Sequence, residues 1–121
     1  MTKGQAIQNF FENFALSVYS SASVPEDAVM PYLTYDCVLD GQFAETSIQV
    51  NLWYYSSSEV EANAKAEEIG EVIDTMYPLP CDKGLIWLKR GSPWCQALYD
   101  EASDKVKRRL LNVTAEFMTT H

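Results

Sequence analysis

Residues 46–74, TSIQVNLWYYSSSEVEANAKAEEIGEVID, decide the fold because the spacing of their apolar side chains changes partway along. Up to residue 55 the apolar residues recur at every second position, which predicts a strand over 44–55. One face of this strand carries Ile48, Val50, Leu52 and Tyr54, and the opposite face carries Ser47, Gln49, Asn51, Trp53 and Tyr55. After residue 58 the spacing becomes three or four, which predicts a helix over 58–76.

The predicted helix has its own signals. Ser58 and Glu61 have the spacing of a capping box at its start. Its buried side is expected to carry Val60, Ala62, Ala66, Ile69, Val72, Ile73 and Met76. Gly70 weakens the helix by about 1 kcal/mol relative to alanine, and we interpret it as a place of close packing.

Upstream of this unit, a first helix and a strand are predicted. Over 2–19 the apolar residues again fall three and four apart, and Thr2 with Gln5 resembles a capping box. The expected stripe is Ile7, Phe10, Phe11, Phe14 and Val18. Residues 20–31 predict a loop, and the alternation over 32–40 predicts a strand that pairs with 44–55 through a turn at Asp40-Gly41.

Downstream, two or three further strands are expected. Residues 84–91 are apolar and bounded by glycines, residues 93–101 favour a short extended piece, and residues 105–118 alternate clearly. The predicted order is therefore α-β-β-α-β-β-β within one domain that covers residues 1–121. This pattern is typical of an α+β fold, with two helices on one face of a largely antiparallel sheet of four to five strands.

The charge of the chain limits its partners. Seventeen acidic residues outweigh nine basic ones, so the net charge is −8. A nucleic-acid-binding protein needs a basic face to neutralise phosphates, so sequence-specific DNA binding is not expected. The odd number of cysteines and the lack of a leader or a long apolar run favour an intracellular, reduced and soluble protein.

Residues suited to catalysis are few. The only histidine is the last residue, His121, and no cysteine has a histidine partner in the sequence pattern. The cysteines Cys37, Cys81 and Cys95 lack the spacing of metal ligands. We therefore expect no catalytic residue, no metal and no cofactor, so that the chain is not an enzyme. A small hydrolase or transferase that uses Asp36, Asp40 or Cys37 remains the enzymatic alternative.

Aromatic and basic residues are the candidates for an interface with another subunit or partner: Trp53, Tyr55, Trp87, Trp94, Lys105, Lys107, Arg108 and Arg109. Trp53 and Tyr55 lie opposite the apolar face of their strand, so they need a cover from another segment or another copy. The run KVKRR over 105–109 has three interpretations: a solvated strand edge, a contact with an acidic neighbouring copy, or a contact with DNA.

Four stretches resemble one family. VPEDAVMPYLTY (24–35), IQVNLWYYSSSEVEANAKAEEIGEVI (48–73), CDKGLIWLKRGSPWCQ (81–96) and KRRLLNVTAEFMT (107–119) are similar to small proteins of tailed bacteriophages and prophages. These proteins are described variously as tail terminator, tail completion, head–tail joining or minor capsid proteins. The resemblance covers nearly the whole chain, in order.

The resemblance implies a structural role. Such proteins are α+β domains that form a ring, commonly a hexamer, which caps the tail tube and docks to the head. The implied partners are copies of the chain itself, tail-tube proteins and head-connector proteins, with no membrane partner. DNA would pass through such a ring without specific binding, which suits an acidic protein. The implied location is the bacterial cytoplasm during assembly and then the virion tail or head–tail junction.

One alternative function belongs to another class. A small host binding module or regulator would hold a ligand in a pocket between the helices and the sheet. It is distinguished from the phage structural protein by a concave apolar cavity with a few convergent polar groups, and by a monomeric state.

Overall fold

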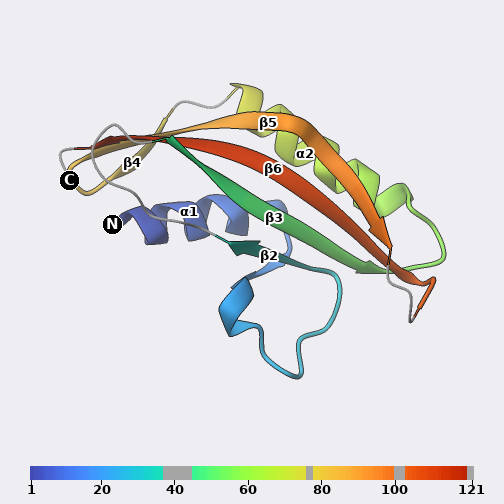
Figure 1. Ribbon diagram of the computed structural model, residues 1–121. Helices are drawn as coiled ribbons and strands as arrows, with labels where there is room; N and C mark the ends of the chain where they lie inside the picture. Colours follow the sequence, from blue (N-terminus) through green and yellow to red (C-terminus); the bar gives the residue numbers. More distant parts are fainter. Residues whose placement is uncertain (37–44, 76–77, 100–102, 120–121) are drawn as a thin grey trace.

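The chain folds into one six-stranded sheet with two α-helices, an α+β arrangement (Figure 1). The computed structural model describes residues 1–36, 45–75, 78–99 and 103–119. In chain order the elements are α1 (Lys3–Phe11), the 3-10 turn η1 (Glu12–Phe14), β1 (Ser17–Ser20), the 3-10 turn η2 (Ser21–Ser23), β2 (Tyr32–Asp36), β3 (Glu45–Tyr55), α2 (Val60–Thr75), β4 (Leu79–Cys81), β5 (Gly84–Tyr99) and β6 (Val106–Thr119).

The sheet has the strand order β1-β2-β3-β6-β5-β4, and its long strands bend along their length (Figure 1). Strands β1 and β2 are parallel, and the other pairings are antiparallel. The prediction of a largely antiparallel sheet is therefore confirmed, but the expected number of strands was too low, because β1 and β4 were not predicted. The predicted turn at Asp40-Gly41 lies outside the described residues.

The two segments predicted at 84–91 and 93–101 form one strand, β5. Both segments pair with β6, which is long enough to run beside them. The pairing register shifts between Arg90 and Cys95. The extra residues of this irregularity contain Gly91 and Pro93, the residues that suggested a break in the sequence.

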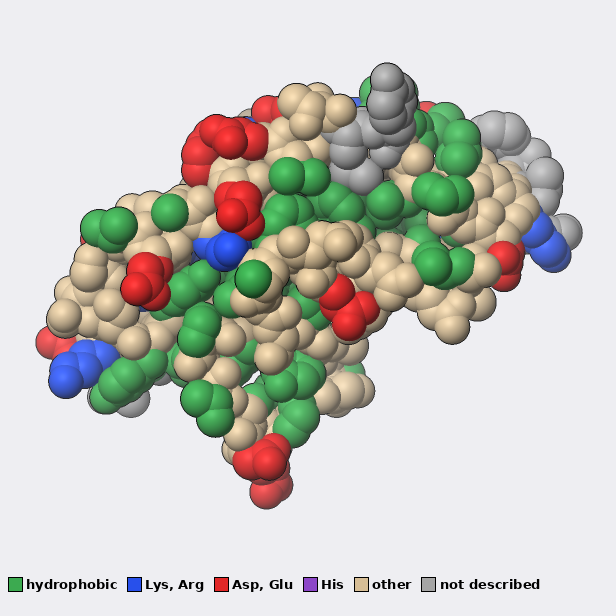
Figure 2. Space-filling model, turned by 180° about the vertical axis from the view of Figure 1, so that it is seen from behind, with side chains coloured by type: hydrophobic (Ala, Val, Ile, Leu, Met, Phe, Trp, Pro, Cys, Tyr) green, Lys and Arg blue, Asp and Glu red, His purple; other side chains and the backbone are tan. Residues whose placement is uncertain are grey.

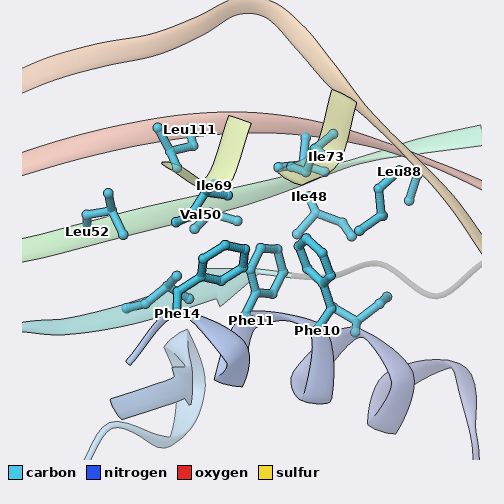
Figure 3. Packing of buried hydrophobic residues seen from close by; sticks show 14 of the residues in the cluster. Phe10, Phe11, Phe14, Ile48, Val50, Leu52, Ile69, Ile73, Leu88 and Leu111 are labelled. Carbon is cyan, nitrogen blue, oxygen red and sulfur yellow. The ribbon is translucent and has the colours of Figure 1, made fainter. Parts of the chain in front are cut away.

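Both helices pack on the same face of the sheet, here called the inner face (Figure 3). Phe10, Phe11 and Phe14 from the α1 region point toward Ile48, Val50 and Leu52 of β3, and Ile69 and Ile73 of α2 reach the same cluster. The predicted faces of β3 are confirmed, since Ile48, Val50 and Leu52 are fully buried. The register of β3 against β6 pairs Ile48 with Val113 and Val50 with Leu111, so both strands bury the same face.

The first helix is shorter than predicted. Its capping box is confirmed, because the Thr2 hydroxyl accepts a hydrogen bond from the Gln5 amide and the Gln5 side chain accepts one from the Thr2 amide. After the turn η1, however, Ala15 adopts a left-handed backbone with φ 59°, which ends the helical path. Val18 thus reaches the core from strand β1 and not from the helix as predicted.

The second helix begins at Val60 and ends at Thr75. Ala62, Ala66, Ile69 and Ile73 are buried as predicted, whereas Val60 and Val72 are 71% and 39% exposed, so their predicted burial was wrong. Gly70 does mark a close approach, because a Cβ there would lie 2.6 Å from the guanidinium carbon of Arg90. Arg90 crosses the helix at this point and donates from Nε to the Gly70 carbonyl oxygen at 3.3 Å.

Candidate functional site

The opposite face of the sheet, here called the outer face, has no helix packed on it among the described residues. Strand alternation places on it Tyr32 and Thr34 of β2, Asn51, Trp53 and Tyr55 of β3, Leu85, Trp87 and Lys89 of β5, and Arg108, Leu110 and Met118 of β6. It combines aromatic, aliphatic and basic side chains with polar ones such as Thr34 and Asn51. Of these types, aromatic residues, Met and Arg are enriched at interfaces between proteins.

Four side chains on or beside this face form a continuous contact, here called the aromatic row. The rings of Tyr19 and Tyr32 are 5.8 Å apart in an edge-to-face arrangement, and those of Tyr32 and Trp53 are 6.2 Å apart. The guanidinium carbon of Arg108 lies 4.7 Å from the Trp53 ring centre, which is a cation–π contact. The row therefore links strands β1, β2, β3 and β6.

Two buried polar residues hold the aromatic row in place. The Trp53 indole Nε1 donates to the Thr34 hydroxyl at 3.0 Å, and Arg108 Nε donates to the Asn51 side-chain oxygen at 2.8 Å. Thr34 and Asn51 are only 4% and 6% exposed, so these bonds form away from water. Trp53 and Arg108 are thus oriented before any partner arrives, which lowers the entropy lost on binding.

At the other end of the outer face, a lysine lies between two carboxylates of the same chain. Trp87 is 44% exposed and Leu85 is 42% exposed. The Lys89 ammonium lies 5.2 Å from the Trp87 ring centre, 3.4 Å from a Glu116 carboxylate oxygen and 3.9 Å from one of Glu45. This end therefore offers exposed apolar surface beside a lysine whose charge is already paired within the chain.

The basic run 105–109 does not act as one surface. Arg109 faces inward and is 4% exposed; its Nη2 donates to Glu59 at 2.8 Å and its Nε donates to the Asn63 side-chain oxygen at 2.9 Å. Arg109 is therefore engaged within the chain, and we expect it to support the fold and not to contact a partner directly. Lys105 is exposed at the end of the hairpin, and Lys107 is half-buried and donates to the Asp104 carbonyl.

The two remaining aromatic candidates, Trp94 and Tyr55, also differ in how far the chain covers them. Trp94 packs against the core, and the guanidinium carbon of Arg90 lies 5.2 Å from its ring centre, so the chain itself covers part of this side chain. Tyr55 is 63% exposed at the end of β3. It lies beside the loop that contains Val29, where a surface hollow of about 470 Å³ is present.

The sequence analysis did not name Tyr32 and Tyr19 as candidates. Tyr32 alternates with Leu33 along its strand, so the two-residue period was enough to place Tyr32 on the outer face. Tyr19 was assigned to the first helix, and nothing in its local sequence indicates the parallel pairing of β1 with β2.

A second concave region lies between α1 and β4. This hollow of about 430 Å³ is lined mostly by apolar atoms of residues that include Ala6, Phe10, Leu79 and Cys81. Asp82 at its rim pairs with the N-terminal ammonium group at 2.6 Å. Partial desolvation raises the pKa of the Cys81 thiol, which lowers the fraction of reactive thiolate.

Of the residues of the enzymatic alternative, the structure describes only Asp36. Asp36 is exposed at the end of β2, whereas Cys37 and Asp40 lie outside the described residues. Burial also raises the pKa of the Cys95 thiol. Among the described residues, no group of three or more His, Cys, Asp and Glu side chains is arranged to hold a metal ion.

A scan against models of protein families and a search of curated proteins give no match. No helix in the described part of the chain has the length and apolar character needed to cross a membrane.

Proposed function

We propose that this chain is a structural protein of a tailed bacteriophage or prophage, which caps the tail tube or joins the tail to the head as a member of a ring. The proposal assigns no chemical reaction to the chain. The observation that carries it is the outer face: a sheet surface without a helix on it, with Trp53 and Arg108 oriented by buried hydrogen bonds. The similarity of the four sequence stretches to phage tail terminators indicates the kind of assembly in which this surface would be used.

The composition of the outer face supports binding to another protein. Trp, Tyr and Arg are the residue types that contribute most to binding energy when a protein interface is formed. They combine a large apolar area with polar atoms that can be satisfied at the rim. The aromatic row places these three types side by side, and the Leu110 and Leu98 side chains of the neighbouring strands extend its apolar surface.

The edges of the sheet also support assembly. On the side of β5 away from β6, only the three residues of β4 provide backbone partners among the described residues. Strand β4 contains Pro80, which discourages further pairing, but residues 95–98 of β5 contain no proline and no charge. Such an unprotected edge is suited to extend the sheet toward a neighbouring subunit.

The charge distribution supports passage of DNA through a ring. Among the described residues, several basic side chains pair with carboxylates of the same chain, namely Lys65, Lys89, Arg90 and Arg109. These internal pairs leave little positive surface for phosphates on a chain of net charge −8. A lumen made by such a protein would repel DNA and would not retain it.

The direct experiment uses phage tails produced without this protein. Purified chain is added to these tails, and negative-stain electron microscopy scores tail ends while a head-joining assay scores infectious particles. We expect a ring at one end of each tail and recovery of head joining. Light scattering after size exclusion gives the state of the free chain. Failure of the chain to bind completed tails would overturn the proposal.

A small ligand-binding module is the second candidate, and the hollow between α1 and β4 is the observation that favours it. Its volume is within the range of small-molecule sites. A screen of small apolar ligands by nuclear magnetic resonance tests this function. Specific shifts confined to Ala6, Phe10 and Cys81, from a chain that stays monomeric and does not bind tails, would favour the module over the structural protein.

A further inference from the structure

We propose that, in the assembled ring, the aromatic row of one copy binds the exposed side of α2 of the next copy, with Arg108 paired to Glu71. This inference rests on the proposed function and names the two surfaces that would meet. The contact joins different surfaces of identical chains, and such head-to-tail contacts produce closed rings or open filaments.

Arg108 lacks a carboxylate partner among the described residues. Its partners are the neutral Asn51 side chain and the Trp53 ring. By contrast, the other two arginines that the structure describes are each paired with carboxylates: Arg90 with Asp74 at 3.0 Å, and Arg109 with Glu59 at 2.8 Å. Arg108 is therefore a fixed positive charge on the outer face that remains available to an acidic partner.

The exposed side of α2 has the complementary charge. Figure 2 views the molecule from the helical side and shows acidic side chains along α2. At 3.6 residues per turn, Val60, Ala64 and Glu71 lie roughly opposite the buried side of the helix, and all of them are exposed. Glu71 forms no ion pair within the described structure, whereas Glu68 pairs with Lys65 at 3.0 Å.

The spacing of the two surfaces also agrees. Arg108, Trp53 and Tyr32 are paired across adjacent strands, so Arg108 and Tyr32 are two strand spacings apart, about 9.6 Å. Glu71 and Ala64 are separated by about 10.5 Å along the helix axis, since each residue adds about 1.5 Å. A helix laid across the strands with Glu71 over Arg108 therefore places Ala64 near Tyr32 and Val60 toward Tyr19. These small side chains let the helix approach the aromatic rings closely.

A charge-swap experiment tests this contact. Arg108→Glu and Glu71→Arg are made singly and together, and assembly is measured by light scattering over a concentration series and by binding to unterminated tails. Each single variant is expected to raise the concentration for half-maximal assembly at least tenfold. The double variant restores an oppositely charged pair at every contact, so it is expected to recover most of the assembly.

The matched control for Glu71→Arg is Glu12→Arg, which makes the same change in net charge at an exposed acid of η1 that belongs to neither proposed surface. It is expected to assemble like the wild type. Circular dichroism melting checks that each variant is folded. If Arg108→Glu does not fold, Glu71→Arg carries the test alone, because an exposed helix position tolerates the change.

The results separate this inference from the proposed function. If the wild type binds tails and Glu71→Arg assembles as well as the wild type, the inference is overturned and the proposed function stands. The inference also fails if the double variant assembles no better than either single variant, or if Glu12→Arg has an equal effect. If the wild type neither assembles nor binds tails, the proposed function fails first.

Discussion

Arg109 should stabilise the fold and should have no direct part in assembly, although it stands next to Arg108 in the sequence. We consider the change Arg109→Met, which keeps much of the apolar stem and removes the guanidinium. The guanidinium bonds Glu59 at 2.8 Å and Asn63 at 2.9 Å while the residue is 4% exposed. These bonds join the last strand to the start of α2, so their loss should loosen the packing of that helix on the sheet.

The magnitude follows from the environment of each partner. Loss of one partner of a fully buried ion pair costs about 3–5 kcal/mol. The Glu59 side chain, however, is 48% exposed and regains water when the arginine is removed, so the solvent-screened value is lower. Hydrogen bonds to charged groups contribute about 1.5–3 kcal/mol. We therefore expect Arg109→Met to lower the free energy of unfolding by about 2 kcal/mol, which corresponds to a fall in Tm of about 6–10 °C.

Urea denaturation of Arg109→Met, Glu59→Gln and the double variant measures the pairwise coupling. We expect a coupling energy of about 1 kcal/mol that persists at 1 M salt, because the guanidinium lies away from the solvent. Assembly of Arg109→Met, measured well below its Tm, should equal that of the wild type. Normal stability with impaired assembly would refute the reasoning, and so would a coupling energy indistinguishable from zero.

Three further substitutions test the local packing, each by urea denaturation. Gly70→Ala should destabilise by about 1 kcal/mol because its Cβ displaces the Arg90 guanidinium, but in an Arg90→Ala background it should stabilise by up to about 1 kcal/mol through helix propensity; an unchanged sign in the two backgrounds contradicts this. Gly84→Ala should cost about 2–3 kcal/mol, because its Cβ would meet the Met118 carbonyl oxygen of the adjacent strand; a neutral result would be incompatible with that contact. Thr2→Ala should cost about 1 kcal/mol through loss of the capping box, whereas Thr2→Ser should be nearly neutral; equal losses would exclude a capping effect.

Strand β3 and helix α2 were predictable because their apolar residues recur with unambiguous spacings, every second position in the strand and every third or fourth in the helix. A shift of one residue would expose Ile48, Val50 and Leu52, so the apolar pattern fixes the face of the strand as well as its existence. The α+β class followed from the same reasoning applied to the other segments. Strand β1 was not predictable in this way, because Val18 continues the helical spacing, and the left-handed backbone of Ala15 that ends the helix has no signal in the sequence.

The face of the sheet on which a candidate residue lies was predictable from strand alternation. The contacts that a residue makes with other elements were not predictable. Trp53 was placed on the correct face by the two-residue period. The same period places Arg109 on the face of Leu111, which would have separated it from Arg108. What the sequence could not supply was the position of Glu59 at the start of α2, which makes burial of this arginine favourable. Arg108 and Arg109 belong to one basic run in the sequence but therefore lie in two different environments.

The distribution of apolar residues between the two faces has a consequence for assembly. The core is built from the inner face of the sheet and both helices, with Phe11, Ile69 and Phe117 buried without help from the outer face. A chain of this kind completes its core before it meets a partner, unlike obligate oligomers whose core is shared between subunits. Under the proposed function, each copy would thus fold alone and remain ready to join others.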